Sequence, residues 1–375
     1  MATPALFQPL QVRHLALRNR IVIPPMCQYS AQDGKPTDWH IMHWGNMLQS
    51  GAGLFIIEAT AVSPEGRISA HDVGLWDDHT EAAIANTLGR VRRYSTMPVG
   101  IQLAHAGRKA SCHRPWINKG AQVAPGQPEG WQTLAPSALP YRESDHPPVA
   151  MTLDDLTRIK QAFVDAAQRV VRLGFDLIEL HAAHGYLLHE FLSPLSNART
   201  DQYGGSFQNR MRFPLEVFAA VRHAVPAHVP VGVRISATDW VEGGWDVEQS
   251  QAFCREIEAH RGNFIDVSAG ALDTRQHMGV YPAYQIPLAR AIKNTVDDIP
   301  VMGVGLVTSP QLAEATVAVG DVDLIGIARG LLYDPRWPWH AAAELGATVD
   351  ISPQYARCQP HTLSDLFAIR GQNQP

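Results

Sequence analysis

The sequence predicts an α/β fold, a (β/α)8 TIM barrel in which eight parallel strands alternate with eight helices. Eight short apolar segments rich in β-branched residues recur along the 375 residues, and segments of helical length separate them. The apolar segments are nearly continuous, as in strands buried on both faces of a parallel sheet. Eight such strand–helix units close into a barrel. The alternative is an open doubly wound sheet, but no Gly-x-Gly-x-x-Gly turn follows the first strand.

The expected strands lie where β-branched and other apolar residues concentrate between turn-forming residues. In chain order they are 20–26, 53–60, 99–105, 176–181, 230–236, 264–269, 300–305 and 323–328. Barrels of this kind often reach this length as one unit, so we expect a single domain over residues 1–375.

The expected helices follow the strands. They are 40–49, 79–94, 153–173, 209–224, 247–260, 284–295, 310–319 and 335–345. Thr152 and Ser309 precede two of them, and their hydroxyl oxygens can accept hydrogen bonds from unpaired backbone N–H groups of the first turn. Pro310 stands at a first helical position, where no N–H is needed.

Three segments interrupt the alternation of strands and helices. Residues 8–18, within an N-terminal segment 1–18, predict a short hairpin suited to closing the barrel bottom. Residues 111–150 are rich in proline and glycine and predict an extended loop after the third strand. Loops of this length often act as lids. Residues 358–375 predict a polar C-terminal tail.

Composition and charge argue against several kinds of partner. The formal net charge of -5 provides no broad basic surface, so we expect no nucleic-acid and no membrane partner. No segment reaches the roughly 18 consecutive apolar residues of a membrane span, and no secretory signal is visible, so we expect a cytoplasmic protein. The four cysteines have no Cys-x-x-Cys spacing, which argues against a zinc ribbon, an iron–sulfur cluster and a disulfide framework.

Polar and reactive residues gather at the C-terminal ends of the expected strands. These ends meet at one mouth of a barrel, so residues distant in sequence converge there. A glutamine, an arginine, histidines and glycines suit a planar polar ligand that carries a phosphate. The convergent residues are Pro24, Pro25, Met26, Cys27, Tyr29, Ala59, Gln102, His105, His181, His184, Tyr186, Arg234, Gly305, Ala328 and Arg329.

The loops after the seventh and eighth strands predict a phosphate site. Barrels commonly hold phosphates there with backbone N–H groups and a helix N-terminus. Gly305 lies in the first loop, and Ala328 and Arg329 lie in the second. Each glycine-containing loop alone is equally consistent with a tight turn, but together with Arg329 they favour a phosphate.

His181, His184 and Tyr186 directly follow a buried strand and predict catalysis. Two imidazoles offer hydrogen-bond donors to an anionic oxygen, and a phenol beside them offers a proton. Zinc ligation is an alternative, although the other strand ends supply no carboxylates. A second alternative is a pair of core histidines. Cys27 lies at the first strand's mouth and is equally consistent with a small buried hydrophobe.

Longer motifs resemble the Old Yellow Enzyme family of flavin-dependent ene-reductases, in its cysteine-containing, thermophilic-like branch. The resemblance covers residues 6–357. It rests on 23–30 (IPPMCQYS), 100–109 (GIQLAHAGRK) and 181–186 (HAAHGY), and on shorter matches within 190–210.

The resemblance implies non-covalent FMN at the mouth of an eight-stranded barrel, NADPH or NADH as reductant, and reduction of the C=C bond of enones and enals. It implies that His181 and His184 bind the substrate carbonyl oxygen, that Tyr186 donates the proton and that Tyr29 shapes the substrate pocket. Residues implied to bind the cofactor are Pro24, Pro25, Met26, Cys27, Ala59, Gln102, Arg234, Gly305, Ala328 and Arg329.

The resemblance also implies a homodimer or homotetramer in which an arginine near the C-terminus enters the neighbouring subunit's substrate site. Arg357 matches that position, and a solvated tail arginine is its alternative. Other activities stay open at this point: the same flavin fold acting on nitro compounds or nitrate esters, a metal-dependent barrel hydrolase or aldolase, and a non-catalytic flavin-binding barrel.

Overall fold

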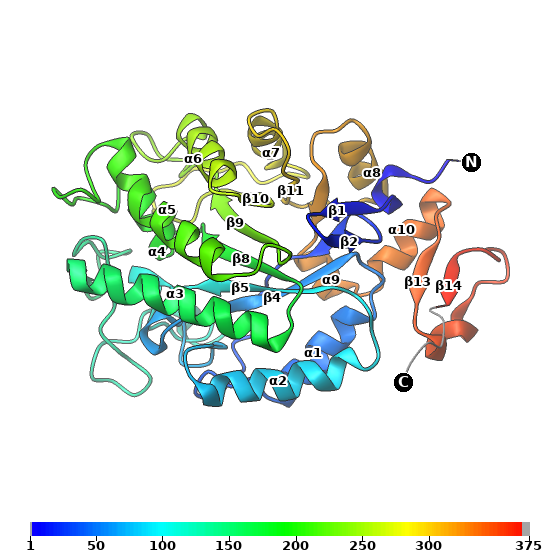
Figure 1. The fold of residues 1–375 in the computed structure, drawn as a ribbon, viewed down its shortest axis with the longest axis horizontal. Coiled ribbons are helices and arrows are strands. Elements are labelled where there is room, and N and C mark those ends of the chain that lie inside the picture. Colours follow the sequence, from blue (N-terminus) through cyan, green and yellow to red (C-terminus); the bar gives the residue numbers. More distant parts are fainter. Residues whose placement is uncertain (1, 370–375) are drawn as a thin grey trace.

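Eight parallel strands close into a barrel in the computed structural model, which describes residues 2–369 (Figure 1). Around the barrel they follow chain order, and the last strand pairs with the first. Their bounds are β3 Ile21–Ile23, β4 Leu54–Ala61, β5 Val99–Ala104, β8 Leu177–Ala182, β9 Val231–Ser236, β10 Ile265–Ser268, β11 Val301–Gly303 and β12 Leu324–Gly326. The predicted TIM barrel and its eight strands are confirmed. β3 ends earlier than expected because Pro24 and Pro25 have no N–H to continue the ladder.

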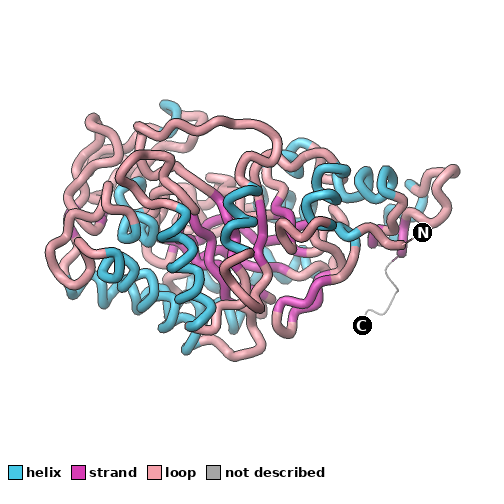
Figure 2. The backbone as a smooth tube through the Cα atoms, turned by 90° about the horizontal axis from the view of Figure 1, so that it is seen from above, coloured by secondary structure: helices cyan, strands magenta, loops and turns pink. Residues whose placement is uncertain are grey.

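Helices surround the strands, which lie in the middle of the molecule in Figure 2. Those predicted are confirmed as α1 Asp38–Leu48, α2 Asp78–Arg92, α3 Leu153–Leu173, α5 Phe207–Ala224, α6 Val247–Ala259, α7 Ile286–Lys293, α8 Pro310–Ala318 and α10 Trp337–Leu345. Thr152 and Ser309 cap α3 and α8 through their side chains, as expected. The sequence did not predict α4 Leu187–Leu192 and α9 Arg329–Tyr333. All six residues of α4 are buried, so no amphipathic pattern marks it.

The N-terminal hairpin closes the barrel at the ends where the strands begin. Its strands, β1 Leu10–Val12 and β2 Leu15–Leu17, pair in an antiparallel manner. Val12 and Leu17 are each 1% exposed. They belong to an inner apolar cluster with Val22, Leu54, Ile56, Leu177, Phe264, Met302 and Leu324. The predicted hairpin is therefore confirmed, and it forms the apolar floor of the barrel.

Truncation of this floor should destabilise the fold. We expect Leu17→Ala to lower the free energy of unfolding by about 2–5 kcal/mol, because it leaves a cavity among close-packed strand residues. Gln11→Ala, at an exposed position of the same hairpin, should change it by about 0.5 kcal/mol or less. Equilibrium urea unfolding followed by far-UV circular dichroism measures both, and equal losses would contradict a floor built on Leu17.

Residues 111–150 form the predicted extended connection after β5, and several hydrogen bonds anchor it. It contains η4 Asn118–Gly120 and a short parallel pair, β6 Leu134–Ala135 with β7 Val149–Ala150. The Ser111 hydroxyl donates to Val123 O at 2.8 Å and accepts from Trp131 N at 2.9 Å. The Arg108 guanidinium donates to the carbonyls of Leu139 and Pro140. The loop itself is confirmed, while its action as a lid stays a prediction.

The C-terminal segment folds back onto the molecule: residues 358–369, expected as part of a polar tail, include a short strand. β13 Val349–Ile351 pairs in parallel with β14 Phe367–Ile369. Leu366 is 6% exposed, and the Phe367 ring lies 5.0 Å from that of Trp339 in α10. Residues 370–375 lie outside the described part of the chain.

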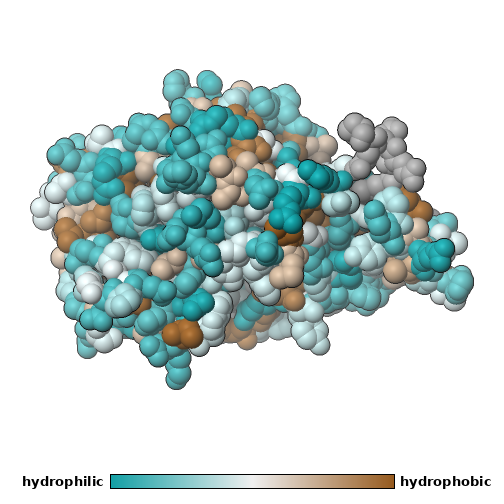
Figure 3. Space-filling model, turned by 90° about the horizontal axis from the view of Figure 1, so that it is seen from below, coloured by the Kyte–Doolittle hydropathy of each residue, from teal (hydrophilic) through white to brown (hydrophobic). Residues whose placement is uncertain are grey.

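The face of the molecule in Figure 3 is mainly hydrophilic, with apolar residues as separate spots. Within residues 2–369, no helix has both the length and the apolar character that a membrane crossing requires.

Candidate active site

Side chains that point into the barrel form layers above the apolar floor. The next layer is polar, and it contains Gln102, Glu179, Arg234 and Asp266. Strand register places Gln102 beside Ala59 and Glu179, and Arg234 beside Asp266. Because alternate residues of a strand point to the same face, His181 and Ser268 stand one step further toward the C-terminal ends. The residues that the sequence placed at a mouth are thus carried by neighbouring strands.

Gln102 and Arg234 are each held by a buried carboxyl group. Gln102 Nε2 donates to Glu179 Oε1 at 2.7 Å. Arg234 Nε lies 3.1 Å from Asp266 Oδ2. The amide oxygen of Gln102 and the terminal nitrogens of Arg234 have no hydrogen-bond partner among residues 2–369. These groups are therefore free to bind a ligand.

His181 and His184 lie next to each other, with ring centroids 5.2 Å apart. His181 Nδ1 accepts a hydrogen bond from Ala183 N at 3.2 Å, so a neutral ring carries its proton on Nε2. The backbone N–H of His184, whose φ is 58°, donates to Ser236 Oγ at 2.9 Å. His184 Nε2 lies 2.7 Å from Ser268 Oγ, which leaves Nδ1 available to a ligand.

Both imidazoles are neutral at physiological pH. Burial lowers the pKa of His181 and His184 well below the ordinary value of 6.5, and the positive charge of Arg234 lowers both further. A neutral imidazole has one N–H group to donate. The pair therefore suits two hydrogen bonds to one oxygen atom, such as a carbonyl oxygen that gains negative charge.

Tyr186 follows the histidines at the start of α4, and its ring lies 4.8 Å from that of His181 at an interplanar angle of 90°. Burial raises the pKa of its phenol well above the ordinary value of 10.0. The phenol therefore stays protonated and can transfer a proton to a strong base such as an enolate carbon.

Lys109 braces the turn that carries these residues. Its ammonium group donates to the carbonyls of His184 and Ala271, both at 2.8 Å, and lies 5.3 Å from the Tyr186 ring centroid. Burial lowers the pKa of Lys109 to about 8. The sequence motif contained Lys109 but gave it no role.

Cys27 and Tyr29 lie at the end of β3. Burial, with a smaller contribution from Asp72, raises the pKa of the Cys27 thiol well above its ordinary value. The neighbouring Cys27 sulfur and burial also raise the pKa of Tyr29. The Tyr29 ring makes an edge contact with Trp116 of the long loop, with ring centroids 6.1 Å apart. A protonated thiol is a weak nucleophile, so Cys27 suits a contact role at the mouth. Pro24, Pro25 and Met26 precede it.

The loops after β11 and β12 meet as the sequence predicted. Gly305 has a φ of 117°, and a Cβ atom there would lie 3.1 Å from Gln285. Gln285 is 4% exposed, and its amide oxygen has no partner in the described chain. Ala328 precedes α9, and Arg329 makes no side-chain hydrogen bond with residues 2–369. An unpaired guanidinium at the start of α9, in the loop that follows the strand next to β11, fits a phosphate. The sequence gave no signal for Gln285.

Two residues named from the sequence make no hydrogen bond or ring contact with His181, His184 or Tyr186 in the described chain. His105 is 1% exposed, its Nδ1 accepts from Gly107 N at 3.1 Å, and burial lowers its pKa to about 4. Arg357 lies exposed in η5 Pro353–Cys358, beside β13 and β14 (Figure 1). A role for Arg357 in a neighbouring subunit stays a prediction.

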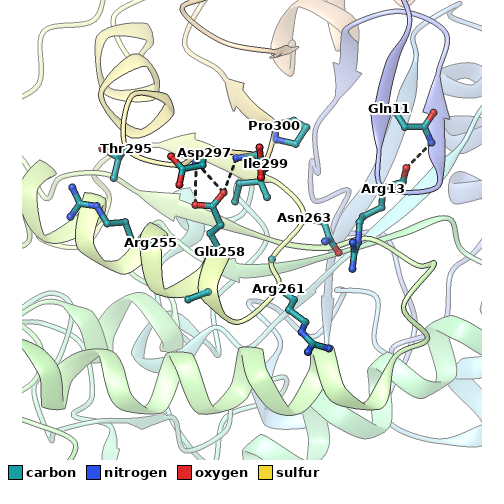
Figure 4. Close-up of a pocket in the computed structure, with 13 residues that line it drawn as sticks. Gln11, Arg13, Arg255, Glu258, Arg261, Asn263, Thr295, Asp297, Ile299 and Pro300 are labelled. Carbon is teal, nitrogen blue, oxygen red and sulfur yellow. Dashed lines mark hydrogen bonds between the residues drawn. The ribbon is translucent and has the colours of Figure 1, made fainter.

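A hollow of about 960 Å³ lies at the opposite end of the barrel (Figure 4). Asn263 and Pro300, which precede β10 and β11, line it. The Glu258 carboxylate there already accepts hydrogen bonds from the backbone N–H groups of Asp297 and Asp298. This hollow is separate from the strand ends that carry the histidines. Within the described part of the chain, no three His, Cys, Asp or Glu residues are grouped to hold a metal ion.

Comparison with known proteins places these features in a family. A model of the NADH:flavin oxidoreductase / NADH oxidase family matches residues 5–347. An NADPH dehydrogenase of Geobacillus thermodenitrificans is 43% identical over 354 residues, covering 94% of this chain and 98% of the relative. An NADH:flavin oxidoreductase of Gibberella zeae is 41% identical over 367 residues, covering 93% and 87%. The structure of morphinone reductase is similar with a TM-score of 0.75, at 28% identity over 98% of this chain and 94% of that one.

Proposed function

The chain belongs to the NADH:flavin oxidoreductase / NADH oxidase family as an FMN-dependent oxidoreductase of the Old Yellow Enzyme type, and from this premise we propose that it reduces the C=C bond of α,β-unsaturated carbonyl compounds. The observation that supports this substrate class is the pair of neutral imidazoles, His181 and His184, beside the protonated phenol of Tyr186. The reductant is a nicotinamide: relatives are named NADPH dehydrogenase, and one morphinone reductase structure contains tetrahydroNAD.

The unpartnered polar groups of the mouth fit FMN. Gln102 and Arg234 can bind the polar edge of the ring, and Arg329 with the Gly305 loop can bind the phosphate. Pro24, Pro25, Met26, Cys27, Ala59 and Ala328 complete the proposed cofactor site. When bound, FMN supplies a hydride equivalent to the substrate β-carbon.

The protein groups supply the acid and the oxyanion donors. Hydride addition to the β-carbon puts negative charge on the carbonyl oxygen, where His181 and His184 donate hydrogen bonds that strengthen as the charge grows. Tyr186 then donates its proton to the α-carbon, and solvent restores that proton. Tyr29 borders the space that the substrate enters. Arg357 acts in the neighbouring subunit of a homodimer or homotetramer in the cytoplasm.

Comparison of acceptors tests this substrate class. With NADPH and limited oxygen, cyclohexenone should be converted to cyclohexanone, with one NADPH consumed per product. Cyclohexanone itself, which has no activated C=C bond, is the control and should not oxidise the reduced protein. Rapid turnover of nitro compounds or nitrate esters without any reduction of enones would support the alternative acceptor class instead.

The phosphate site gives a separate prediction. Arg329→Ala should weaken FMN binding roughly 10–100-fold, because a charge-assisted hydrogen bond to a phosphate contributes about 1.5–3 kcal/mol. Affinity for riboflavin, which has no phosphate, should stay nearly unchanged. Quenching of flavin fluorescence on titration of the flavin-free protein measures both constants. An equal loss for FMN and riboflavin would place Arg329 away from the phosphate.

A further inference from the structure

Two buried carboxyl groups and one guanidinium form a charge cluster in the polar layer of the barrel. Glu179 and Asp266 are both 0% exposed, and Arg234 is 8% exposed. Arg234 is the register neighbour of Asp266 in β10 and of His181 in β8. With both carboxyl groups ionised, two negative charges would face one positive charge in the barrel interior.

The hydrogen bonds of this cluster are incomplete. Glu179 Oε1 accepts from Gln102, but Glu179 Oε2 has no partner in the described chain. Asp266 Oδ1 has no partner there either. An unpaired buried carboxylate oxygen is costly, and protonation removes much of that cost. The cluster is therefore built to hold a proton.

The two carboxyl groups differ in how readily they bind a proton. Burial and the nearby Asp266 charge raise the pKa of Glu179 to about 8. Burial raises the pKa of Asp266 to about 6, against the opposing effect of Arg234. Glu179 and Arg234 are the charged neighbours of Asp266. On its other side, in β11, the uncharged residue Met302 is in register with Asp266. Glu179 therefore binds a proton more readily than Asp266, whose carboxylate is paired with Arg234.

We propose that Asp266 is a redox-linked proton site, which binds one proton from solvent when bound FMN gains two electrons and releases it on reoxidation. The inference rests on the proposed function. Two-electron reduction by NADPH transfers one hydride, giving NADP⁺ and one added negative charge at the mouth. That charge attracts Arg234 through its free terminal nitrogens, and so weakens the hold of the guanidinium on Asp266, which is paired with Nε. Proton binding to Asp266 then restores the original net charge.

Proton counting on the FMN-loaded protein tests the proposal. In weakly buffered, anaerobic solution near pH 7, a pH indicator should report about one proton taken up per flavin that NADPH reduces. Asp266→Asn should reduce this uptake to near zero, since the amide cannot ionise. Glu179→Gln, which mimics the protonated neighbour, should retain it. The pH dependence of the reduction potential should change in the same way: it should correspond to two protons per two electrons in the wild type and to one in Asp266→Asn.

Several outcomes would overturn the inference. Uptake of one proton in both the wild-type protein and Asp266→Asn would assign the proton to another group, and no uptake in the wild type would leave Asp266 without this role. If Asp266→Asn does not fold or retain FMN, the reduced-minus-oxidised infrared difference spectrum of the wild type decides: a carboxylic-acid C=O band must appear on reduction. Failure of the proposed function looks different, because the protein would then hold no FMN or reduce no enone.

Discussion

Tyr186→Phe should slow the reaction of the reduced protein with cyclohexenone by about 10²–10⁴-fold, the usual contribution of a positioned general acid. Phenylalanine keeps the ring contact with His181 but has no proton to donate to the α-carbon. The reaction of the oxidised protein with NADPH needs no such proton, so its rate should stay nearly unchanged. Anaerobic stopped-flow absorbance at the flavin band measures the two half-reactions separately.

Tyr29→Phe is the matched control for this prediction. Tyr29 is a second phenol at the mouth, and its ring contact with Trp116 survives the change. We expect a much smaller effect on the enone reaction than with Tyr186→Phe. Equal losses in both half-reactions of Tyr186→Phe, or equal effects of the two substitutions, would remove Tyr186 from the acid role. Because the pKa of Tyr186 is raised, the enone reaction should show no loss from ionisation of Tyr186 up to its ordinary pKa near 10.0.

Removal of either imidazole donor should have an effect of comparable size. We expect His181→Ala and His184→Ala each to slow the enone reaction by about 10²–10³-fold, the loss typical of one oxyanion donor. A phenol whose oxygen takes the position of the substrate oxygen should bind over the flavin and change its absorbance, and both variants should lose this change. Titration with p-hydroxybenzaldehyde measures this binding directly.

A conservative variant separates hydrogen bonding from packing at this position. His184→Asn retains an N–H donor within similar reach, so it should recover much of the activity that His184→Ala loses. Unaltered phenol binding in both alanine variants would contradict the assignment of these histidines to the substrate oxygen. A similar loss in the asparagine and alanine variants would point to packing rather than donation.

The sequence predicted the barrel because eight nearly continuous apolar segments of strand length alternate with segments of helical length. It also predicted that the residues after β8, β11 and β12 lie at the same end of the barrel, because parallel strands all end there. The family motifs then supplied the proposed roles of His181, His184 and Tyr186, and the contacts among their rings are compatible with those roles.

Other features carried no periodic signal. α4 is buried on all sides, and β14 lies against α10 through a contact between Phe367 and Trp339 that no local sequence pattern shows. Glu179 sits in an apolar run, and only strand register reveals that it faces Gln102 inside the barrel. Lys109 and Gln285 act through carbonyl and loop contacts set by tertiary structure.

The catalytic cycle of the purified protein tests the central claim most directly. The account predicts a yellow protein with about one FMN per chain, which NADPH bleaches without oxygen and one equivalent of cyclohexenone turns yellow again, with cyclohexanone as product. A folded protein that neither contains nor takes up FMN, or whose reduced flavin is not reoxidised by the enone, would contradict it.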